Sequence, residues 1–366
     1  MITNVLQFGS YVRTESVSSN DIAAANPFQE TDNHNFFHSC AIPNVWIDLR
    51  LLQIHAYNHD TSIFRFQLPP NKQRLNLPVG CYLLIKHPSD AATVRPYAAV
   101  HDDDVLNGNL NDHDTGSFEI LCKRYDEWGQ KESPSTHFLF TKTDHSYRPP
   151  GIMSNYLHNL KIGEKACFQF NQVCMGSLGR HLRSFSQHES LSTLTMIAVG
   201  VGVAPMIACL RSLFEQRDQD IQEHSACIPP ARVKVVLLYG VREVRDILMR
   251  EVLEEWHKKY PDMFSLHYCV GSRWSNVHMG AKTKSEYIPP PLPAGFEAIA
   301  EHASLGWVNE EKIQTYGYPP SDHTLVVVCG LPGVYHKLCG PRTELQLSSD
   351  CALYNLGYRT EMVCKL

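Results

Sequence analysis

The chain has 366 residues, which is enough for two globular domains with full cores. Its formal net charge of −5 argues against a nucleic-acid partner, which would call for a basic surface. The longest apolar run, residues 196–206, is far shorter than the roughly 20 residues of a transmembrane helix, so we expect no such helix. The twelve cysteines are scattered without a CxxC pair or a zinc-like spacing, which predicts an intracellular, reducing compartment and no metal site.

Residues 1–45 are polar and rich in asparagine and serine, and we expect them to form an N-terminal extension. The first 14 residues contain no acid and one basic residue, Arg13, as a mitochondrial presequence would. A disordered tail fits the same composition and is the interpretation that composition favours. A mitochondrial location is therefore an expectation that depends on this stretch alone.

Short apolar runs separated by turn signals follow as far as about residue 183. Residues 63–68 alternate between apolar and polar with period two, and residues 81–85 follow a turn at 77–80. Residues 118–125 have the same strand-like character. Frequent strands with one short helix predict an antiparallel, six-stranded β-barrel domain over residues 46–183.

After Leu191 the pattern changes to continuous apolar strands that alternate with helices. We predict strands at 194–199, 233–239, 264–270 and 324–329, and helices at 205–216 and 246–260. This alternation predicts a doubly wound α/β domain over residues 190–366. Residues 275–306, with a proline-rich run in the middle, are predicted to be an insertion at one edge of that domain.

Several segments in fixed order resemble the NADH–cytochrome b5 reductase family of the ferredoxin–NADP reductase superfamily. They are residues 58–69, 77–80, 95–97, 306–313 and 329–332. Each segment alone is a weak pattern, but the ordered set over about 300 residues is specific. The resemblance implies an FAD-binding barrel followed by an NAD(P)-binding domain.

Arg95, Pro96 and Tyr97 match the family positions that hold the flavin phosphate and pack on the isoalloxazine ring. Arginine offers a forked donor that suits phosphate, and a tyrosine two residues further along a strand projects to the same face. Spacing alone also fits an alternative in which Arg95 is a surface residue and Tyr97 a core residue, without a cofactor. The family has a hydroxyl residue next, where this chain has Ala98, so we expect slower hydride transfer.

The resemblance adds Ile120 and Lys123, on the following strand, to the cofactor-binding set.

Gly151, Met153 and Ser154 match the family's glycine turn and the helix whose N-terminal amides meet the flavin pyrophosphate. A helix N-terminus suits an anion because its first amides lack partners within the helix. Ile152 stands where the family has lysine, which removes one positive charge. An ordinary serine-capped helix is the alternative.

Gly200, Gly202 and Pro205 match the family's nucleotide-binding turn, where glycines let the backbone approach a pyrophosphate closely. Val201 and Ala204 replace two threonines of the family pattern. A tight strand-to-helix turn without a ligand is the alternative. The nicotinamide nucleotide is expected at the carboxyl edge of the α/β sheet.

Ser272 and Arg273 resemble the pair that relatives preferring NADPH use for the extra phosphate, and a solvated loop arginine is the alternative. Cys329, followed by Gly330 and Pro332, matches the segment that faces the nicotinamide. The sequence ends in Leu366, where relatives commonly have an aromatic residue that shields the flavin.

Two functions remain open from the sequence. The first is an FAD-dependent NADPH or NADH oxidoreductase that passes electrons to a protein acceptor such as cytochrome b5. The second is a reductase-fold subunit of a larger assembly, for which the N-terminal stretch suggests a mitochondrial location, with weak or no catalysis. It is kept open because the departures from the family cluster in its cofactor motifs.

Overall fold

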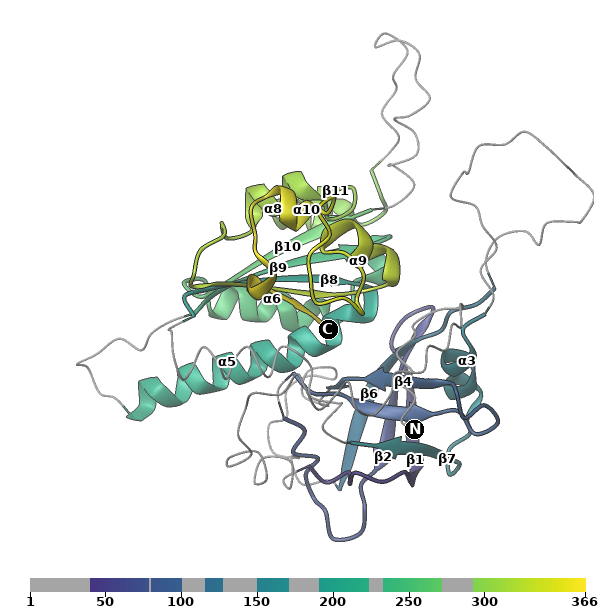
Figure 1. Ribbon diagram of the computed structural model, residues 1–366. Helices are drawn as coiled ribbons and strands as arrows, with labels where there is room; N and C mark the ends of the chain where they lie inside the picture. The colour runs from purple at the N-terminus through teal and green to yellow at the C-terminus, as the bar shows by residue number, and fades with distance from the viewer. Residues whose placement is uncertain are drawn as a thin grey trace, which may run out of the picture. The chain divides into compact units, whose positions relative to one another are not determined.

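The computed structural model describes two units of the chain, each treated by itself (Figure 1). The described residues are 40–78, 80–100, 116–127, 150–170, 191–223, 233–271 and 292–366. One unit is built on an antiparallel sheet and the other on a parallel sheet, in that chain order. The predicted fold class is confirmed.

An antiparallel sheet with strand order β4-β3-β7-β1-β2-β6-β5 forms the first unit. The elements are β1 (Ile47–Ala56), β2 (Thr61–Gln67), β3 (Leu83–Lys86), β4 (Val94–Tyr97), β5 (Ala99–Val100), β6 (Ser117–Lys123), α3 (Ile152–Asn159) and β7 (Lys165–Gln169). β4 and β5 stand at opposite ends of this order, yet Ala98 alone separates them, so the sheet closes on itself. Counted as one strand bent at Ala98, they give the six-stranded barrel that the sequence predicts.

Aromatic side chains fill the interior of the barrel. The ring of Phe66 on β2 lies 4.8 Å from that of Phe168 on β7 and 6.0 Å from that of Phe118 on β6. Phe66 and Phe168 are fully buried. The period-two alternation of β2 in the sequence directs these rings inward, because successive strand residues point to opposite faces.

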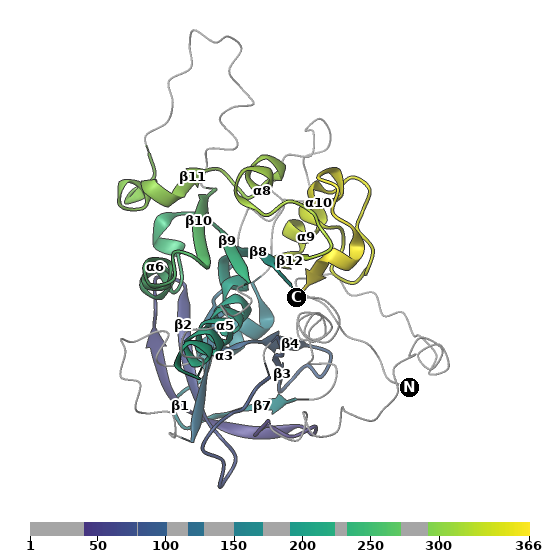
Figure 2. The same cartoon turned by 90° about the vertical axis from the view of Figure 1, so that its left-hand side faces the viewer.

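A six-stranded parallel sheet with the order β11-β10-β9-β8-β12-β13 forms the second unit. Its strands are β8 (Thr193–Val199), β9 (Lys234–Val241), β10 (Phe264–Val270), β11 (Ala303–Leu305), β12 (Thr324–Cys329) and β13 (Val363–Lys365). Its α-helices are α5 (Ala204–Glu223), α6 (Arg250–Lys259), α8 (Glu310–Tyr316), α9 (Pro332–Leu338) and α10 (Ala352–Asn355). Helices α5 and α6 cover one face of the sheet, and α8, α9 and α10 cover the other (Figures 1 and 2).

Three predicted elements of the second unit differ clearly from the observed ones. The helix predicted at 205–216 continues to Glu223. The helix predicted from residue 246 begins at Arg250, because Val244–Asp246 forms a 3-10 turn and Met249 adopts a left-handed backbone. The end of the predicted insertion, Ala303–Leu305, forms the edge strand β11, which is too short to show a strand pattern. The rest of that insertion, up to residue 291, lies outside the described residues, as does the boundary predicted between 183 and 190.

In the parts of the chain that the structure describes, no helix has both the length and the apolar character of a membrane span.

Candidate cofactor sites

Strand β4 holds Arg95 and Tyr97 through its pairing with β3, where Arg95 lies opposite Ile85 and Tyr97 opposite Leu83. The guanidinium of Arg95 is half-buried and donates a hydrogen bond of 2.8 Å to the carbonyl of Val94. Among the described residues it forms no ion pair. Burial lowers the pKa of Arg95, so an anion beside this guanidinium would offset a real desolvation cost.

Tyr97 points its hydroxyl at Cys122 on β6, with 3.8 Å between the oxygen and the sulfur. Burial, with a smaller effect of Cys122, raises the pKa of Tyr97, so the phenol is neutral. Ala98 follows at the bend between β4 and β5 and is half-buried. Its methyl group has no donor to offer to a flavin ring beside Tyr97.

Two other predicted residues are engaged within the barrel. Lys123 donates to a carboxylate oxygen of Asp60 at 2.5 Å. Although burial alone would raise it, the pKa of Asp60 is lowered by Lys123, with help from Thr61. The side chain of Ile120 is fully buried in the barrel, opposite Phe64 of β2. The structure therefore shows Lys123 as a partner of Asp60 and Ile120 as a core residue.

Gly151 caps the N-terminus of α3 and joins it to the chain that leaves β6. Its amide donates to the carbonyl of Tyr125 at 2.8 Å. Ser154 accepts from the amide of Tyr125 at 3.2 Å and donates to the carbonyl of Gly151 at 3.1 Å. A Cβ at Gly151 would lie 2.6 Å from the hydroxyl oxygen of Ser154 and 3.1 Å from the Cβ of Tyr125, so a larger residue here would displace the Ser154 hydroxyl from its present hydrogen bonds. The serine-capped alternative is wrong, because the cap is Gly151 and Ser154 is the third residue of the helix.

The first three amides of α3, those of Ile152, Met153 and Ser154, donate to no described acceptor. These amides and the guanidinium of Arg95, which has no ion pair among the described residues, are donors that suit the phosphates of FAD, and the ring of Tyr97 offers an apolar surface for its isoalloxazine. Ile152 is 56% exposed beside these amides and brings no charge to them.

The parallel sheet changes its winding direction between β8 and β12. From β8 the chain moves outward through β9, β10 and β11, and then crosses to β12 and β13 on the other side of β8. In open α/β sheets, ligands bind beyond the carboxyl ends of the strands at such a switch point. The two predicted nucleotide-binding segments follow directly after these two strands.

After β8, the chain forms a 3-10 turn, Gly200–Val203, before α5 begins with Ala204 and Pro205. Gly200 has a φ of +57°, which favours glycine, and no described atom lies within 4 Å of where its Cβ would be. A Cβ at Gly202 would lie 2.3 Å from the carbonyl oxygen of Cys329. Gly200 therefore leaves room for a ligand, while Gly202 lets the two turns pack together.

β12 ends at Cys329, Gly330 follows it, and α9 begins at Pro332. Burial raises the pKa of Cys329, partly offset by Arg342 and Tyr335, so the thiol is neutral. The hydroxyl of Tyr335 accepts from the amide of Gly330 at 3.4 Å and donates to the carbonyl of Leu366.

Sequence reasoning missed the tyrosines that hold these turns. Tyr239, fully buried on β9, donates to the carbonyl of Gly200 at 3.1 Å and accepts from the amide of Leu248 at 3.2 Å. Tyr335 supports the other turn by accepting from the amide of Gly330. A polar hydroxyl within otherwise apolar segments was the available signal.

Gly271 follows β10 at the same carboxyl edge, and Trp307 covers it. A Cβ at Gly271 would lie 2.3 Å from the indole ring. Trp307 is 39% exposed. The predicted pair Ser272 and Arg273 comes next in the chain and lies outside the described residues.

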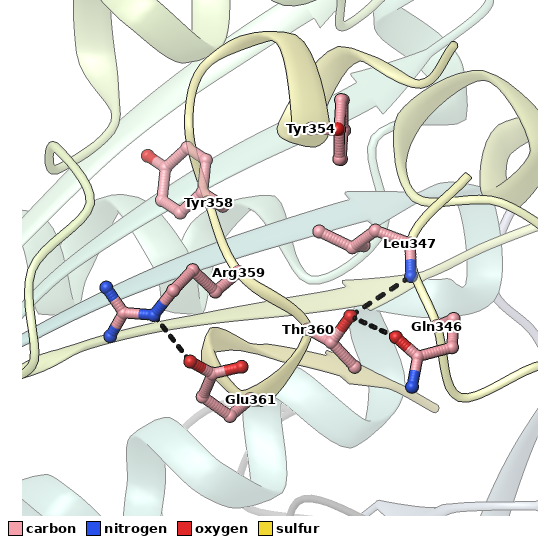
Figure 3. Close-up of a pocket in the computed structure, with 7 residues that line it drawn as sticks. All are labelled: Gln346, Leu347, Tyr354, Tyr358, Arg359, Thr360 and Glu361. Carbon is pink, nitrogen blue, oxygen red and sulfur yellow. Dashed lines mark hydrogen bonds and ion pairs between the residues drawn. The ribbon is translucent and has the colours of Figure 1, made fainter. Parts of the chain in front are cut away.

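A surface pocket lies at the opposite, amino edge of the sheet, on the connection that leads into β13 (Figure 3). Its lining residues are Gln346, Leu347, Tyr354, Tyr358, Arg359, Thr360 and Glu361. Most of their polar groups have protein partners: Arg359 pairs with Glu361 and Asp322, Tyr358 donates to the carbonyl of Tyr318, and Thr360 bonds both Gln346 and the amide of Leu347. With no convergent free donor among these contacts, the pocket is not the candidate cofactor site.

Comparison with known proteins agrees with this arrangement. The model described as "Oxidoreductase FAD-binding domain" matches residues 48–172, and that described as "Oxidoreductase NAD-binding domain" matches residues 196–289. NADH-cytochrome b5 reductase 3 of Rattus norvegicus is 27% identical over 310 residues, which cover 82% of this chain and 83% of that protein. NADH-cytochrome b5 reductase 2 of Homo sapiens is 27% identical over 331 residues, which cover 88% and 94%.

A solved structure, the cytochrome b5 reductase domain of Ulva prolifera nitrate reductase, has the same fold. It superposes with a TM-score of 0.55 at 19% identity and covers 88% of this chain and 98% of that one.

The fold and the two donor sets thus define an oxidoreductase with one domain for FAD and one for a nicotinamide dinucleotide. The two matched models together span more than half of the chain. The chain belongs to the ferredoxin–NADP reductase superfamily, in which it resembles the cytochrome b5 reductases. It is an FAD-dependent NAD(P)H oxidoreductase, and the alternative of a non-catalytic structural subunit is not favoured.

Proposed function

We propose that this chain oxidises NADPH or NADH and passes the electrons through FAD to a haem protein such as cytochrome b5, the acceptor that the names of its relatives indicate. The observation that carries the proposal is the presence of two candidate nucleotide-binding sites in one chain. In the first unit, the site consists of the guanidinium of Arg95, which has no ion pair among the described residues, and the first amides of α3, which have no described acceptor. In the second unit, it is the glycine turn at the switch point. FAD accepts a hydride and returns electrons one at a time.

The residues of the chain bind and orient the two nucleotides. Arg95 and the first amides of α3 bind the flavin phosphates, and Tyr97 packs against the ring. The turn at Gly200 and Gly202 admits the dinucleotide pyrophosphate, and Cys329 lies beside the nicotinamide. The neutral thiol of Cys329 adds no negative charge near the transferred hydride.

An absorbance spectrum tests this function most directly. Protein prepared with excess FAD should retain the visible bands of oxidised flavin, and NADPH or NADH should bleach them without oxygen. Cytochrome b5 should then restore the bands as its haem is reduced. Absence of bound flavin would overturn the whole proposal in favour of the structural-subunit alternative. Bleaching without transfer to cytochrome b5 would overturn only the acceptor.

Replacing Ala98 with serine is expected to speed flavin reduction. The new hydroxyl would restore a hydrogen bond of about 0.5–1.5 kcal/mol near the flavin ring, which corresponds to roughly a tenfold rate at most. Stopped-flow measurement of bleaching gives the rate, and FAD affinity serves as the internal control because the change should leave it unaltered. An unchanged or slower rate would contradict the expected role of this position.

NADPH is proposed to serve at least as well as NADH because Ser272 and Arg273 offer donors for the extra phosphate. Arg273→Ala should weaken the binding of NADPH by about 1–3 kcal/mol, the value of a lost charged hydrogen bond. The binding of NADH should not change. The ratio of kcat/KM for the two nucleotides measures this effect. Arg359→Ala, at the amino edge, is the control. An equal loss of kcat/KM for both nucleotides would show that Arg273 does not bind the extra phosphate of NADPH.

A further inference from the structure

Lys312 is a buried lysine in the first turn of helix α8, where a positive charge is unfavourable. It is the third residue of α8, and the residue is only 9% exposed. Burial of an ammonium costs free energy, and the positive end of a helix dipole adds to that cost. Burial accordingly lowers the pKa of Lys312, which Cys269 and Glu311 partly offset. A residue held against these costs must gain from a specific contact.

The contact is with the turn that follows β11. The ammonium donates to the carbonyl of Leu305 at 2.7 Å and to that of Gly306 at 2.6 Å. Helical side chains lean toward the helix N-terminus, and this direction brings the ammonium to the end of β11. No ion pair joins Lys312 to a described carboxylate. Two neighbouring groups are neutral at pH 7, because burial lowers the pKa of His267 to about 4 and raises that of Cys269 to about 11.

The same turn determines where Trp307 lies. Gly306 has a φ of +91°, and its amide donates to the carbonyl of Val270 at 2.8 Å. The turn is thus fixed to the end of β10, and the indole of Trp307 comes to rest on Gly271 with part of its ring exposed. An exposed aromatic ring at the carboxyl edge of a dinucleotide-binding sheet is a stacking surface for a base.

We infer that Lys312 is a positioning residue for nucleotide binding, which fixes the Leu305–Gly306 turn so that Trp307 presents its ring to the adenine of the dinucleotide. This inference depends on the nicotinamide-nucleotide binding proposed above. It assigns Lys312 no contact with the ligand. Its effect passes through Trp307 alone and concerns the adenosine end of the ligand rather than the nicotinamide end.

Calorimetric titration of the FAD-loaded protein with 5′-AMP and with nicotinamide mononucleotide tests the inference. Lys312→Met should weaken the binding of 5′-AMP about tenfold, which is in the lower range for loss of a base-stacking contact. The affinity for nicotinamide mononucleotide should not change. Lys365→Met is the matched control, because this ammonium also binds backbone carbonyls, those of Pro341, Glu344 and Gln346, but on the β13 side. It should leave 5′-AMP binding unchanged.

A double-mutant cycle separates positioning from a general structural role. In a Trp307→Leu background, Lys312→Met should cause no further loss of 5′-AMP affinity. Additive losses would overturn the inference, as would wild-type affinity in the single variant. If Lys312→Met does not fold, Lys312→Gln, which keeps a neutral donor, replaces it in the same cycle. Wild-type protein that binds no nucleotide would instead refute the proposed function, and this inference with it.

Discussion

Replacing Gly202 with alanine is expected to abolish reduction by NADPH and NADH while FAD stays bound. The added Cβ would lie 2.3 Å from the carbonyl oxygen of Cys329 and 2.7 Å from its carbonyl carbon. These are backbone atoms at the end of β12, so they cannot move aside as a flexible side chain would. The two turns at the switch point must separate, which displaces the backbone on which the dinucleotide rests.

Overpacking of this kind costs about 1–3 kcal/mol of stability, and we expect a loss of at least about 100-fold in kcat/KM for the nucleotide. Steady-state kinetics measures the loss, and the flavin spectrum checks that the first unit is intact. Gly333→Ala is the control, because no described atom lies within 4 Å of the added Cβ and Gly333 is within α9. Gly202→Ala protein with normal nucleotide kinetics would show that this close packing is not needed for binding.

The strands of the second unit were predictable because each carries a continuous apolar run. A parallel sheet covered on both faces requires such runs, and β10 (Phe264–Val270) was predicted to the residue. β11 was missed, since three residues at a sheet edge are too few for a pattern. The barrel was predictable from its alternation, but its closure at Ala98 was not, because pairing order is a property of the folded chain.

In the candidate sites, too, some features were predictable from the sequence and others were not. Glycine turns and Arg95 could be found from the sequence, because their spacing reflects backbone needs and the chemistry of phosphate. The partners of long side chains could not be found from the sequence. Lys123 was predicted to bind the cofactor, and its ion pair with Asp60, which is 63 residues away in the chain, was not predicted. Lys312 gave no signal either, because its two carbonyl partners lie close to its ammonium only in the folded chain.

Replacing Arg95 with alanine is expected to release the flavin. The guanidinium is half-buried on β4 and, among the described residues, has only the carbonyl of Val94 as a partner. A flavin phosphate would supply the missing acceptors. A charge-assisted hydrogen bond to phosphate contributes about 1.5–3 kcal/mol, so its loss should raise the Kd of FAD roughly 10- to 150-fold.

Flavin retained per protein after gel filtration, followed by titration with FAD, measures this effect. Arg95→Lys should lie between the wild type and Arg95→Ala, because lysine keeps the charge but loses the forked donor. Arg124→Ala is the control in the same unit, since Arg124 is exposed and pairs with Asp126 at 3.0 Å. Full flavin retention by Arg95→Ala would mean that the helix amides of α3 hold the phosphates without it. Loss of flavin in the Arg124 control alone would relocate the phosphate site along the chain that leaves β6.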